Sequence, residues 1–449
     1  MGEDLNLSDD LDDEEEDTVE LSLPSYWRER QRQKLQRKNQ AAIDGFLDSG
    51  SHIHVTGIMP SYYGELLTWA LHQYLERNRW QIASTLGYRG PEPVFTDVDT
   101  GNGTHNYLMN GQMLLQHRND RYVITVDIDP RWRGSIQLEG PEAKKEAMEE
   151  FINGVFSIAR EENFYLGRNI EFSGRIRFLE VKDRTWDSIV LDTEIKTDIV
   201  ANTVEFLWQS ERWLRYGIPA KRGVLLAGEP GTGKTVICKA LMAEASGITC
   251  ITTSGYSLDS NGYLTELYEL ADDLSPCIVF IEDIDLIGQN RMEFGYQRGS
   301  ALLSLLSVLD GIEEQDEIVT VATTNCLETL DRALSQRPSR FDRVIRLNRP
   351  SLEQREELLS RLCRKIPLAT EVQRYIALKT DGCTPAQLQE IVYSLVIKCP
   401  AEQDGFTPDK PDIDRAISRI NSSNQRRLGF SRNNHNGSRT ELVTTVRSG

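Results

Sequence analysis

The feature that most constrains the fold of this chain is an eight-residue segment, GEPGTGKT at residues 228–235. It matches the pattern G-x-x-x-x-G-K-[ST], which is diagnostic when a strand precedes it and a helix follows it. Both flanks satisfy that condition, since RGVLLAG is typical of a short buried strand and KTVICKALMAEA is typical of a helix. The segment therefore predicts an α/β fold with a phosphate-binding loop between a strand and a helix.

This loop predicts a nucleotide site. Its glycines let the backbone turn so that several N–H groups face phosphate oxygens, and the helix N-terminus adds partial positive charge. We expect Lys234 to reach the β- and γ-phosphates of ATP and the Thr235 hydroxyl to ligate Mg²⁺. The predicted ATP-binding residues are Gly228, Glu229, Pro230, Gly231, Thr232, Gly233, Lys234 and Thr235.

A second apolar run, CIVFIEDID at 277–285, predicts a buried strand that ends in carboxylates. The end of such a strand is where Mg²⁺ and the attacking water are held in phosphoryl-transfer enzymes. By position, we expect Glu282 to join Thr235 at the metal and Asp283 to orient and polarise the water. Both acids are therefore candidate catalytic residues.

The sequence divides into segments of different composition. Residues 1–50 predict an acidic, disordered tail and a basic helix, because eleven acidic side chains and no Lys or Arg lie in residues 1–20. Whether this helix is merely solvated or binds the acidic tail is left open. We expect an α+β N-terminal domain at 51–183, with RIRFLEV as its closing strand, then a large α/β domain at 184–350. A small helical domain at 351–430 and a disordered tail at 431–449 follow.

Composition limits the function classes. The net charge is −18, so a broadly basic nucleic-acid surface is not indicated and a nucleic-acid partner is not expected. No apolar run approaches the length of a membrane span, and the seven cysteines are scattered without a CxxC pair. These features predict a cytoplasmic protein with no membrane span. No HExxH sequence is present, so coupled proteolysis would need a partner chain.

Over residues 185–430, the chain resembles the AAA family of P-loop ATPases. The segment TWDSIVLDTEIK at 185–196 resembles the family's entry into its ATPase module, and TDGCTPAQLQEIV at 380–392 resembles the helix that closes over the nucleotide. The resemblance implies a P-loop module with a parallel sheet, a C-terminal helical lid and Mg²⁺-dependent ATP hydrolysis. Most relatives carry Asp then Glu at the strand end. Here the order is reversed, as in the branch containing the mitochondrial Rieske-protein translocase, and the reversal either permits hydrolysis or leaves a nucleotide-dependent binder.

The resemblance also implies roles for three further catalytic residues. Asn325, at the end of VATTN, matches the position called sensor 1, which helps to place the attacking water. Arg340 and Arg343, in RPSRFDR at 337–343, match the arginines that reach into a neighbouring subunit's site. Because those arginines act in trans, the resemblance implies a homo-hexameric ring.

Two segments are candidates for gripping a polypeptide substrate. Tyr256 and Tyr263 lie in SGYSLDSNGY at 254–263, a segment that is equally compatible with a plain turn. Phe294 and Tyr296 lie in the second candidate, RMEFGYQRG at 291–299. The first hypothesis for function is an ATP-driven remodeller whose residues 51–183 bind a protein substrate or adaptor. The alternatives are a slow nucleotide-state switch that assembles partner proteins and, less favoured by the charge, a nucleic-acid motor.

Overall fold

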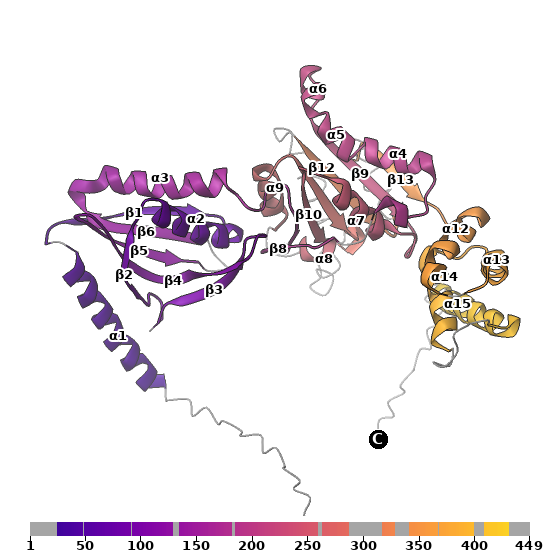
Figure 1. Ribbon diagram of the computed structural model, residues 1–449, viewed down its shortest axis with the longest axis horizontal. Coiled ribbons are helices and arrows are strands. Elements are labelled where there is room, and N and C mark those ends of the chain that lie inside the picture. Colours follow the sequence, from indigo (N-terminus) through magenta and orange to yellow (C-terminus); the bar gives the residue numbers. More distant parts are fainter. Residues whose placement is uncertain are drawn as a thin grey trace, which may run out of the picture. The chain divides into compact units, whose positions relative to one another are not determined.

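The computed structural model divides the chain into two compact units, one formed by residues 1–98 and 104–162 and the other by residues 99–103 and 163–449 (Figure 1). The described residues are 25–47, 49–90, 92–128, 134–181, 185–258, 263–286, 317–327, 341–366, 368–398 and 408–430.

The first unit is built on a six-stranded sheet whose main path runs β1-β6-β5-β4-β2, with β3 also paired to β4. Neighbours along the main path are antiparallel. A tight turn joins β4 to β5 as a hairpin, and Arg118 adopts a φ of 55° in this turn. The strands are β1 (His52–Met59), β2 (Gln81–Leu86), β3 (Val94–Asp99), β4 (Thr104–His117), β5 (Asp120–Asp127) and β6 (Gly134–Pro141).

Helices cover both faces of this sheet. The helix α3 (Lys145–Glu161) packs beside α2 (Gly64–Arg77), and its Met148 lies near Gly140 and Tyr122, on one face. The helix α1 (Ser25–Phe46) packs Ile43 against Leu114 and Val123, which lie on the other face because neighbouring strand residues alternate. Both buried layers are apolar, which is what a two-sided core requires.

The second unit contains a seven-stranded sheet in the order β13-β9-β12-β11-β10-β7-β8. All neighbours from β13 to β7 are parallel, and β8 alone is antiparallel to β7, so the expected parallel sheet is mixed at one edge. The strands are β7 (Asn169–Phe172), β8 (Ile176–Phe178), β9 (Lys221–Gly228), β10 (Thr249–Ser254), β11 (Cys277–Glu282), β12 (Ile318–Thr324) and β13 (Arg343–Leu347).

The position of β7 and β8 differs from the expected domain division. Both strands fall within residues 51–183, the predicted N-terminal domain, yet they extend the sheet of the second unit. The two units divide between Glu162 and Asn163. The strand pattern of RIRFLEV indicated burial correctly but could not indicate which sheet the strand would join, because alternation reports exposure and not the pairing partner.

Helices pack on this sheet through α7, whose Ile237 and Leu241 join one core with Val224, Ile278 and Val319. The α-helices of this part are α4 (Thr193–Ala201), α5 (Val204–Trp208), α6 (Ser210–Arg215), α7 (Lys234–Glu244), α8 (Gly255–Leu258) and α9 (Tyr263–Asp273). Short 3₁₀ helices span Ser61–Tyr63, Glu142–Lys144, Trp186–Ser188, Ile284–Leu286 and Cys363–Lys365.

A group of helices, called the lid below after the role that the family resemblance implies, has a core of its own, which includes Leu359, Ile376 and Ile391. Its four helices, expected for residues 351–430, are α12 (Leu352–Leu362), α13 (Thr370–Lys379), α14 (Pro385–Ile397) and α15 (Lys410–Phe430). Capping boxes at Ser351 and Thr384 begin α12 and α14. None of the helices in the described part of the chain is both long and apolar enough to cross a membrane.

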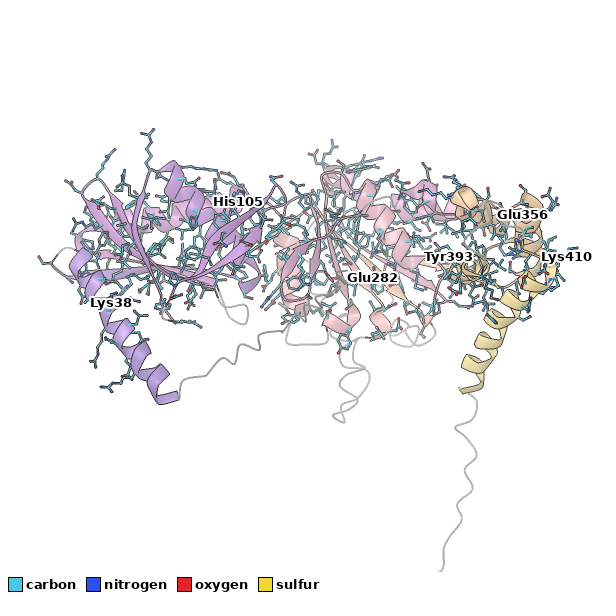
Figure 2. The ribbon with its side chains drawn as sticks, turned by 60° about the horizontal axis from the view of Figure 1, so that its bottom comes forward. Lys38, His105, Glu282, Glu356, Tyr393 and Lys410 are labelled. Atoms are coloured by element: carbon cyan, nitrogen blue, oxygen red, sulfur yellow. The ribbon has the colours of Figure 1, made fainter. Side chains whose placement is uncertain are left out.

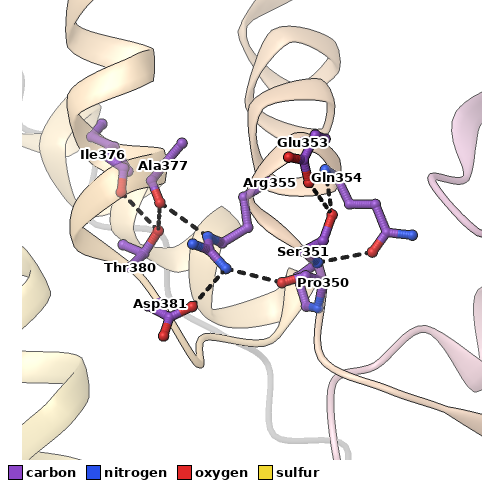
Figure 3. Close-up of polar contacts among 9 residues, drawn as sticks. All are labelled: Pro350, Ser351, Glu353, Gln354, Arg355, Ile376, Ala377, Thr380 and Asp381. Carbon is purple, nitrogen blue, oxygen red and sulfur yellow. Dashed lines mark hydrogen bonds and ion pairs between the residues drawn. The ribbon is translucent and has the colours of Figure 1, made fainter.

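A buried arginine ties the lid together (Figure 3). Arg355 of α12 is 4% exposed, and its guanidinium donates to the carbonyl oxygens of Pro350 and Ala377 and to the Asp381 carboxylate, each at 3.0 Å. A buried guanidinium needs acceptors for its donors, and these three supply them. The start of the lid is therefore fixed to the end of α13.

Candidate functional site

The predicted phosphate-binding loop joins β9 to α7, as its flanking sequence indicated. Gly231 and Gly233 have φ values of 84° and 103°, a left-handed conformation that other residues rarely adopt. A Cβ atom on Gly228 would lie 2.8 Å from the carbonyl oxygen of Leu347. The loop therefore depends on glycine at these positions, and its shape suits close approach of backbone N–H groups to phosphate.

Lys234, the first residue of α7, is buried at the centre of the site with 7% of its surface exposed. Its ammonium group donates to the carbonyl oxygens of Gly228 at 2.8 Å and Glu229 at 3.1 Å, and to Oδ1 of Asn325 at 2.8 Å. Burial lowers the pKa of Lys234, and the carboxylates of Asp283 and Asp285 partly oppose that shift. The cation is thus held by oxygen atoms at the mouth of the loop.

The two residues predicted to hold Mg²⁺ are brought together. Glu282 is the last residue of β11 and is labelled in Figure 2. Its Oε2 accepts a hydrogen bond from the Thr235 hydroxyl at 3.0 Å. Carboxylate and hydroxyl oxygens are ligands that Mg²⁺ accepts, so this pair fits the predicted metal position beside the loop.

The second acid, Asp283, faces Asn325, the predicted sensor residue. Nδ2 of Asn325 donates to Oδ1 of Asp283 at 2.9 Å, so Asn325 bridges Lys234 and Asp283 through the two ends of its amide. The backbone of Asp283 has a φ of 51°, and its N–H donates to the Thr323 hydroxyl at 2.9 Å. This turn directly after β11 sets the Asp283 carboxylate against the end of β12.

Sequence reasoning gave no role to Asp285, yet the structure makes it part of the site. Oδ1 of Asp285 accepts hydrogen bonds from the Thr324 hydroxyl at 3.0 Å and from the backbone N–H of Asn325 at 3.1 Å. It therefore holds the residue that bridges Lys234 and Asp283. The available signal was a third acid two residues after Asp283, at the end of the same buried run.

Arg349 is a second residue that sequence reasoning missed. It lies just after β13 and forms an ion pair with Glu229 of the phosphate loop, with Nη2 of Arg349 2.7 Å from Oε2 of Glu229. The two residues are 120 positions apart, so no local pattern could indicate the pair.

Of the two predicted trans-acting arginines, Arg343 is not brought to the site within one chain. Arg343 begins β13, where it aligns with Val224, whereas Leu347 aligns with Gly228 at the phosphate loop. Its guanidinium binds the carboxylate of Asp198 on α4, with Nε 2.7 Å from Oδ2. Arg343 therefore lies toward the opposite end of the strand from the loop, and Arg340 lies outside the described residues.

The candidate substrate-gripping tyrosines differ in environment. Tyr256 lies in α8 with 61% of its surface exposed. Tyr263 begins α9 and packs edge-on against Phe172, with its ring also filling the space beside Gly174. Tyr256 is thus the accessible member of this pair. The second candidate segment, with Phe294 and Tyr296, lies outside the described residues.

Taken together, the described side chains fit a magnesium–nucleotide complex. In the glycine loop, a Cβ on Gly228 or Gly231 would press on neighbouring protein atoms, so the close backbone path needs glycine. Lys234 supplies a cation, and Thr235 and Glu282 supply adjacent oxygen ligands. The remaining groups, Asp283 and Asn325, are placed where a water molecule could be oriented.

Comparison with known proteins gives one family match. Residues 224–349 match the model of the ATPase family associated with various cellular activities (AAA). This segment includes the phosphate loop, both strand-end acids, Asn325 and Arg349. The match thus confirms the family-level prediction for the part of the chain that carries the site.

Similar proteins include three described as ATP-dependent zinc metalloproteases. FtsH 3 of Sorangium cellulosum is 38% identical over 239 residues, which cover 51% of this chain and 39% of the relative. FtsH of Clostridium perfringens is 33% identical over 54% of this chain and 35% of the relative. FtsH 2 of Methylacidiphilum infernorum is 31% identical over 62% of this chain and 45% of the relative. The chain thus spans less than half the length of these relatives.

The names of those relatives mention zinc, which bears on the side chains seen here. Within the described ranges, no group of three or more His, Cys, Asp or Glu residues is arranged to hold a metal ion. The likeness of the Glu282–Asp283 order to one particular branch of the family stays a prediction, since no comparison tests it.

Proposed function

Since this chain carries an ATPase domain of the AAA family, we propose that it binds ATP with Mg²⁺ and hydrolyses its terminal phosphate. The observation that carries this proposal is the hydrogen-bonded series Lys234–Asn325–Asp283, which lies beside the Thr235–Glu282 pair. These contacts join three separate strand ends at one edge of the sheet. In open α/β sheets, ligands bind outside the carboxyl ends of the strands.

Each side chain has a defined task in this proposal. Lys234 and the loop N–H groups bind the phosphates, and Thr235 and Glu282 hold Mg²⁺, which neutralises charge on the phosphate oxygens when bound. Asp283 orients the attacking water through its carboxylate, and Asn325 keeps that carboxylate in place. Because Asp is one methylene shorter than Glu, the water must lie closer to β11 than in relatives with the usual order.

We further propose that the chain works as a homo-hexameric ring. The position of Arg343, away from the phosphate loop of its own chain, supports a role for Arg340 and Arg343 at a neighbouring subunit's site. An arginine supplied in trans stabilises charge that develops on the transferred phosphate and is worth roughly 10³–10⁵ in rate in comparable enzymes.

The proposed work of the ring is remodelling or unfolding of a protein substrate. The exposed Tyr256 supports a substrate-contacting role for α8. Residues 51–183 are the proposed site for a substrate or adaptor. A cytoplasmic location is also a proposal, supported by the scattered cysteine spacing of the sequence.

Two variants separate binding from hydrolysis. Asp283→Asn should keep its affinity for Mg-ATP and lose turnover by about 10²–10⁴-fold, because the water loses its orienting base. Lys234→Ala should lose both binding and turnover. Glu171→Gln, at an exposed carboxylate on β7 of the same sheet, is the matched control and should change neither. Calorimetry measures binding, and phosphate release measures turnover.

Three outcomes would reject parts of this proposal. Equal binding of Mg-ATP by Lys234→Ala and the unaltered protein would reject the site. Full activity of Arg340→Ala, or no recovery when it is mixed with Lys234→Ala, would reject catalysis in trans. Turnover of minutes per ATP, instead of on the order of one per second with substrate, would favour the nucleotide-state switch.

A further inference from the structure

The phosphate loop contains an acidic side chain, Glu229, whose charge opposes the proposed ligand. Its carbonyl oxygen accepts a hydrogen bond from Lys234 at 3.1 Å, so the residue belongs to the cradle itself. A carboxylate repels the phosphates of a nucleotide, and at the partly exposed edge of a protein this repulsion is not fully screened by water. The loop therefore needs a compensating charge.

Arg349 supplies that charge through a two-point contact. Its Nε lies 3.1 Å from Oε1 of Glu229, and its Nη2 lies 2.7 Å from Oε2. Both oxygens of the carboxylate are thus occupied by one guanidinium, the geometry that gives arginine–carboxylate pairs their strength and orientation. Both side chains are about half exposed, so the pair contributes little to the stability of the fold.

The backbone on either side of Arg349 is held in place. Before it, Leu347 of β13 aligns with Gly228 at the start of the loop. After it, the carbonyl oxygen of Pro350 accepts a hydrogen bond from the buried Arg355 of the lid (Figure 3). Arg349 therefore lies at the joint between the sheet and the lid, with its position set from both sides.

The lid touches the same loop at a second point. The backbone N–H of Ala386, in the first turn of α14, donates to the carbonyl oxygen of Gly231 at 3.2 Å. The missing Cβ of Gly231 would lie 2.9 Å from the Cβ of Ala386. The loop is thus held from the lid side at Gly231 and at Glu229.

A matched cation lies nearby. Arg346 of β13 lines the same cavity of about 830 Å³ as Glu229, Asn325 and Arg349. In the part of the chain that the structure describes, Arg346 forms no ion pair with a carboxylate. It therefore carries the same charge in the same cavity without contacting Glu229, which makes it the control for any general electrostatic effect.

From these contacts we propose that Arg349 is a positioning residue for nucleotide binding: it neutralises and holds Glu229 so that the phosphate loop can receive anionic phosphates. The proposal rests on the proposed function, since it concerns ATP binding at the same loop. It assigns Arg349 no contact with the nucleotide itself. Removal of Arg349 should leave the negative charge of Glu229 uncompensated at the phosphate loop.

The test is a double-mutant cycle measured by calorimetry with Mg-ATP and with Mg-ADP. Arg349→Ala should weaken Mg-ATP binding about tenfold, because Glu229 is left uncompensated. In the Glu229→Gln background, the same Arg349→Ala change should weaken binding less than about twofold, since no carboxylate remains to neutralise. The loss in the original background should be larger for Mg-ATP than for Mg-ADP, because Mg-ATP carries more negative charge. Arg346→Ala should weaken binding less than about threefold in both backgrounds.

Other results would overturn the proposal. Equal weakening by Arg349→Ala in both backgrounds would show that Arg349 binds the nucleotide directly. No weakening in either background would show that the ion pair has no role in binding, and thermal unfolding of each variant establishes that it is folded. Failure of the unaltered protein to bind Mg-ATP would reject the proposed function as well, so the two failures are distinguishable.

Discussion

Both sheets of this chain are covered by buried apolar side chains, but they bring polar residues together differently. In the parallel sheet, β9, β11 and β12 all end at one edge, so Gly228, Glu282 and Thr324 bring their following loops together. In the antiparallel sheet of the first unit, successive strands end at opposite edges. Strand direction thus determines whether separate segments can combine their polar side chains into one site.

Both units contain buried polar atoms without a hydrogen-bond partner among the described residues, and in the second unit these include Nε of Arg222 and the Thr253 hydroxyl. Around Lys234, each donor and acceptor named above has a partner. In the first unit, the Tyr122 hydroxyl and Nε2 of His72 are buried without a hydrogen-bond partner among the described residues. Burial raises the pKa of Tyr122 to about 12 and lowers the pKa of His72, so both side chains are held in their neutral forms. They pack in an aromatic core, where charge would be unfavourable.

The largest expected effects come from matched core substitutions in the two sheets. Leu226 of β9 and Leu115 of β4 are both fully buried, and replacement of either by Ala should cost about 2–5 kcal/mol of unfolding free energy. Mg-ATP at 100 times its Kd should raise the unfolding free energy of the second unit in Leu226→Ala by about 2.7 kcal/mol. It should not stabilise the first unit in Leu115→Ala. Thermal unfolding with and without nucleotide measures both.

Equal stabilisation of the two variants by Mg-ATP would contradict the expected difference between the two sheets. That result would mean that the first unit also binds the ligand or unfolds together with the second. Unfolding of the unaltered chain provides the reference for both transitions.

A smaller effect is expected at the carboxylates that join strand ends. Asp285→Asn should lower turnover about tenfold and leave Mg-ATP affinity nearly unchanged, because it loosens Asn325 without removing a phosphate ligand. Asp127 is the matched residue of the other sheet, since its Oδ1 accepts a hydrogen bond from Asn110 across β4 and β5 at 2.9 Å. Asp127→Asn should leave turnover unchanged, and phosphate release at saturating ATP measures both.

A loss of Mg-ATP affinity in Asp285→Asn as large as its loss of turnover would contradict a positioning role, because it would indicate direct contact between Asp285 and the ligand. A loss of turnover in Asp127→Asn would show that the two units are coupled during hydrolysis.

The smallest effect concerns an exposed ion pair of the first unit. Nη2 of Arg77 lies 2.8 Å from Oε2 of Glu162, and this hydrogen bond lowers the pKa of Glu162 below its ordinary value of 4.5. A carboxylate with a depressed folded pKa stabilises the fold above its unfolded pKa, and this stabilisation is lost as pH falls through the folded pKa. Denaturant unfolding across that pH range should therefore show a small loss of unfolding free energy as pH falls, and Arg77→Ala should remove this loss.

Because both groups are exposed, salt should weaken this pH dependence. If Arg77→Ala lost the same unfolding free energy as pH falls, the loss would come from other carboxylates of the same unit.

Several features of this protein were determined by its sequence alone. The segment GEPGTGKT alone predicts the phosphate-binding loop, because its glycines, lysine and hydroxyl residue at fixed spacing specify a phosphate cradle. The apolar runs RGVLLAG and CIVFIEDID predicted β9 and β11, and the sequence also predicted a small helical domain at 351–430. Such features are local, so a local pattern is enough to predict them.

Only the tertiary structure decided which segments meet. The sheet joined by β7 and β8, the hydrogen bonds of Asp285 to the end of β12, and the Glu229–Arg349 pair all link residues far apart in the chain. A sequence pattern reports whether a side chain will be buried, but its partner depends on how the sheet and the lid pack. For this reason the sequence located the nucleotide loop, and the fold revealed what neutralises and positions it.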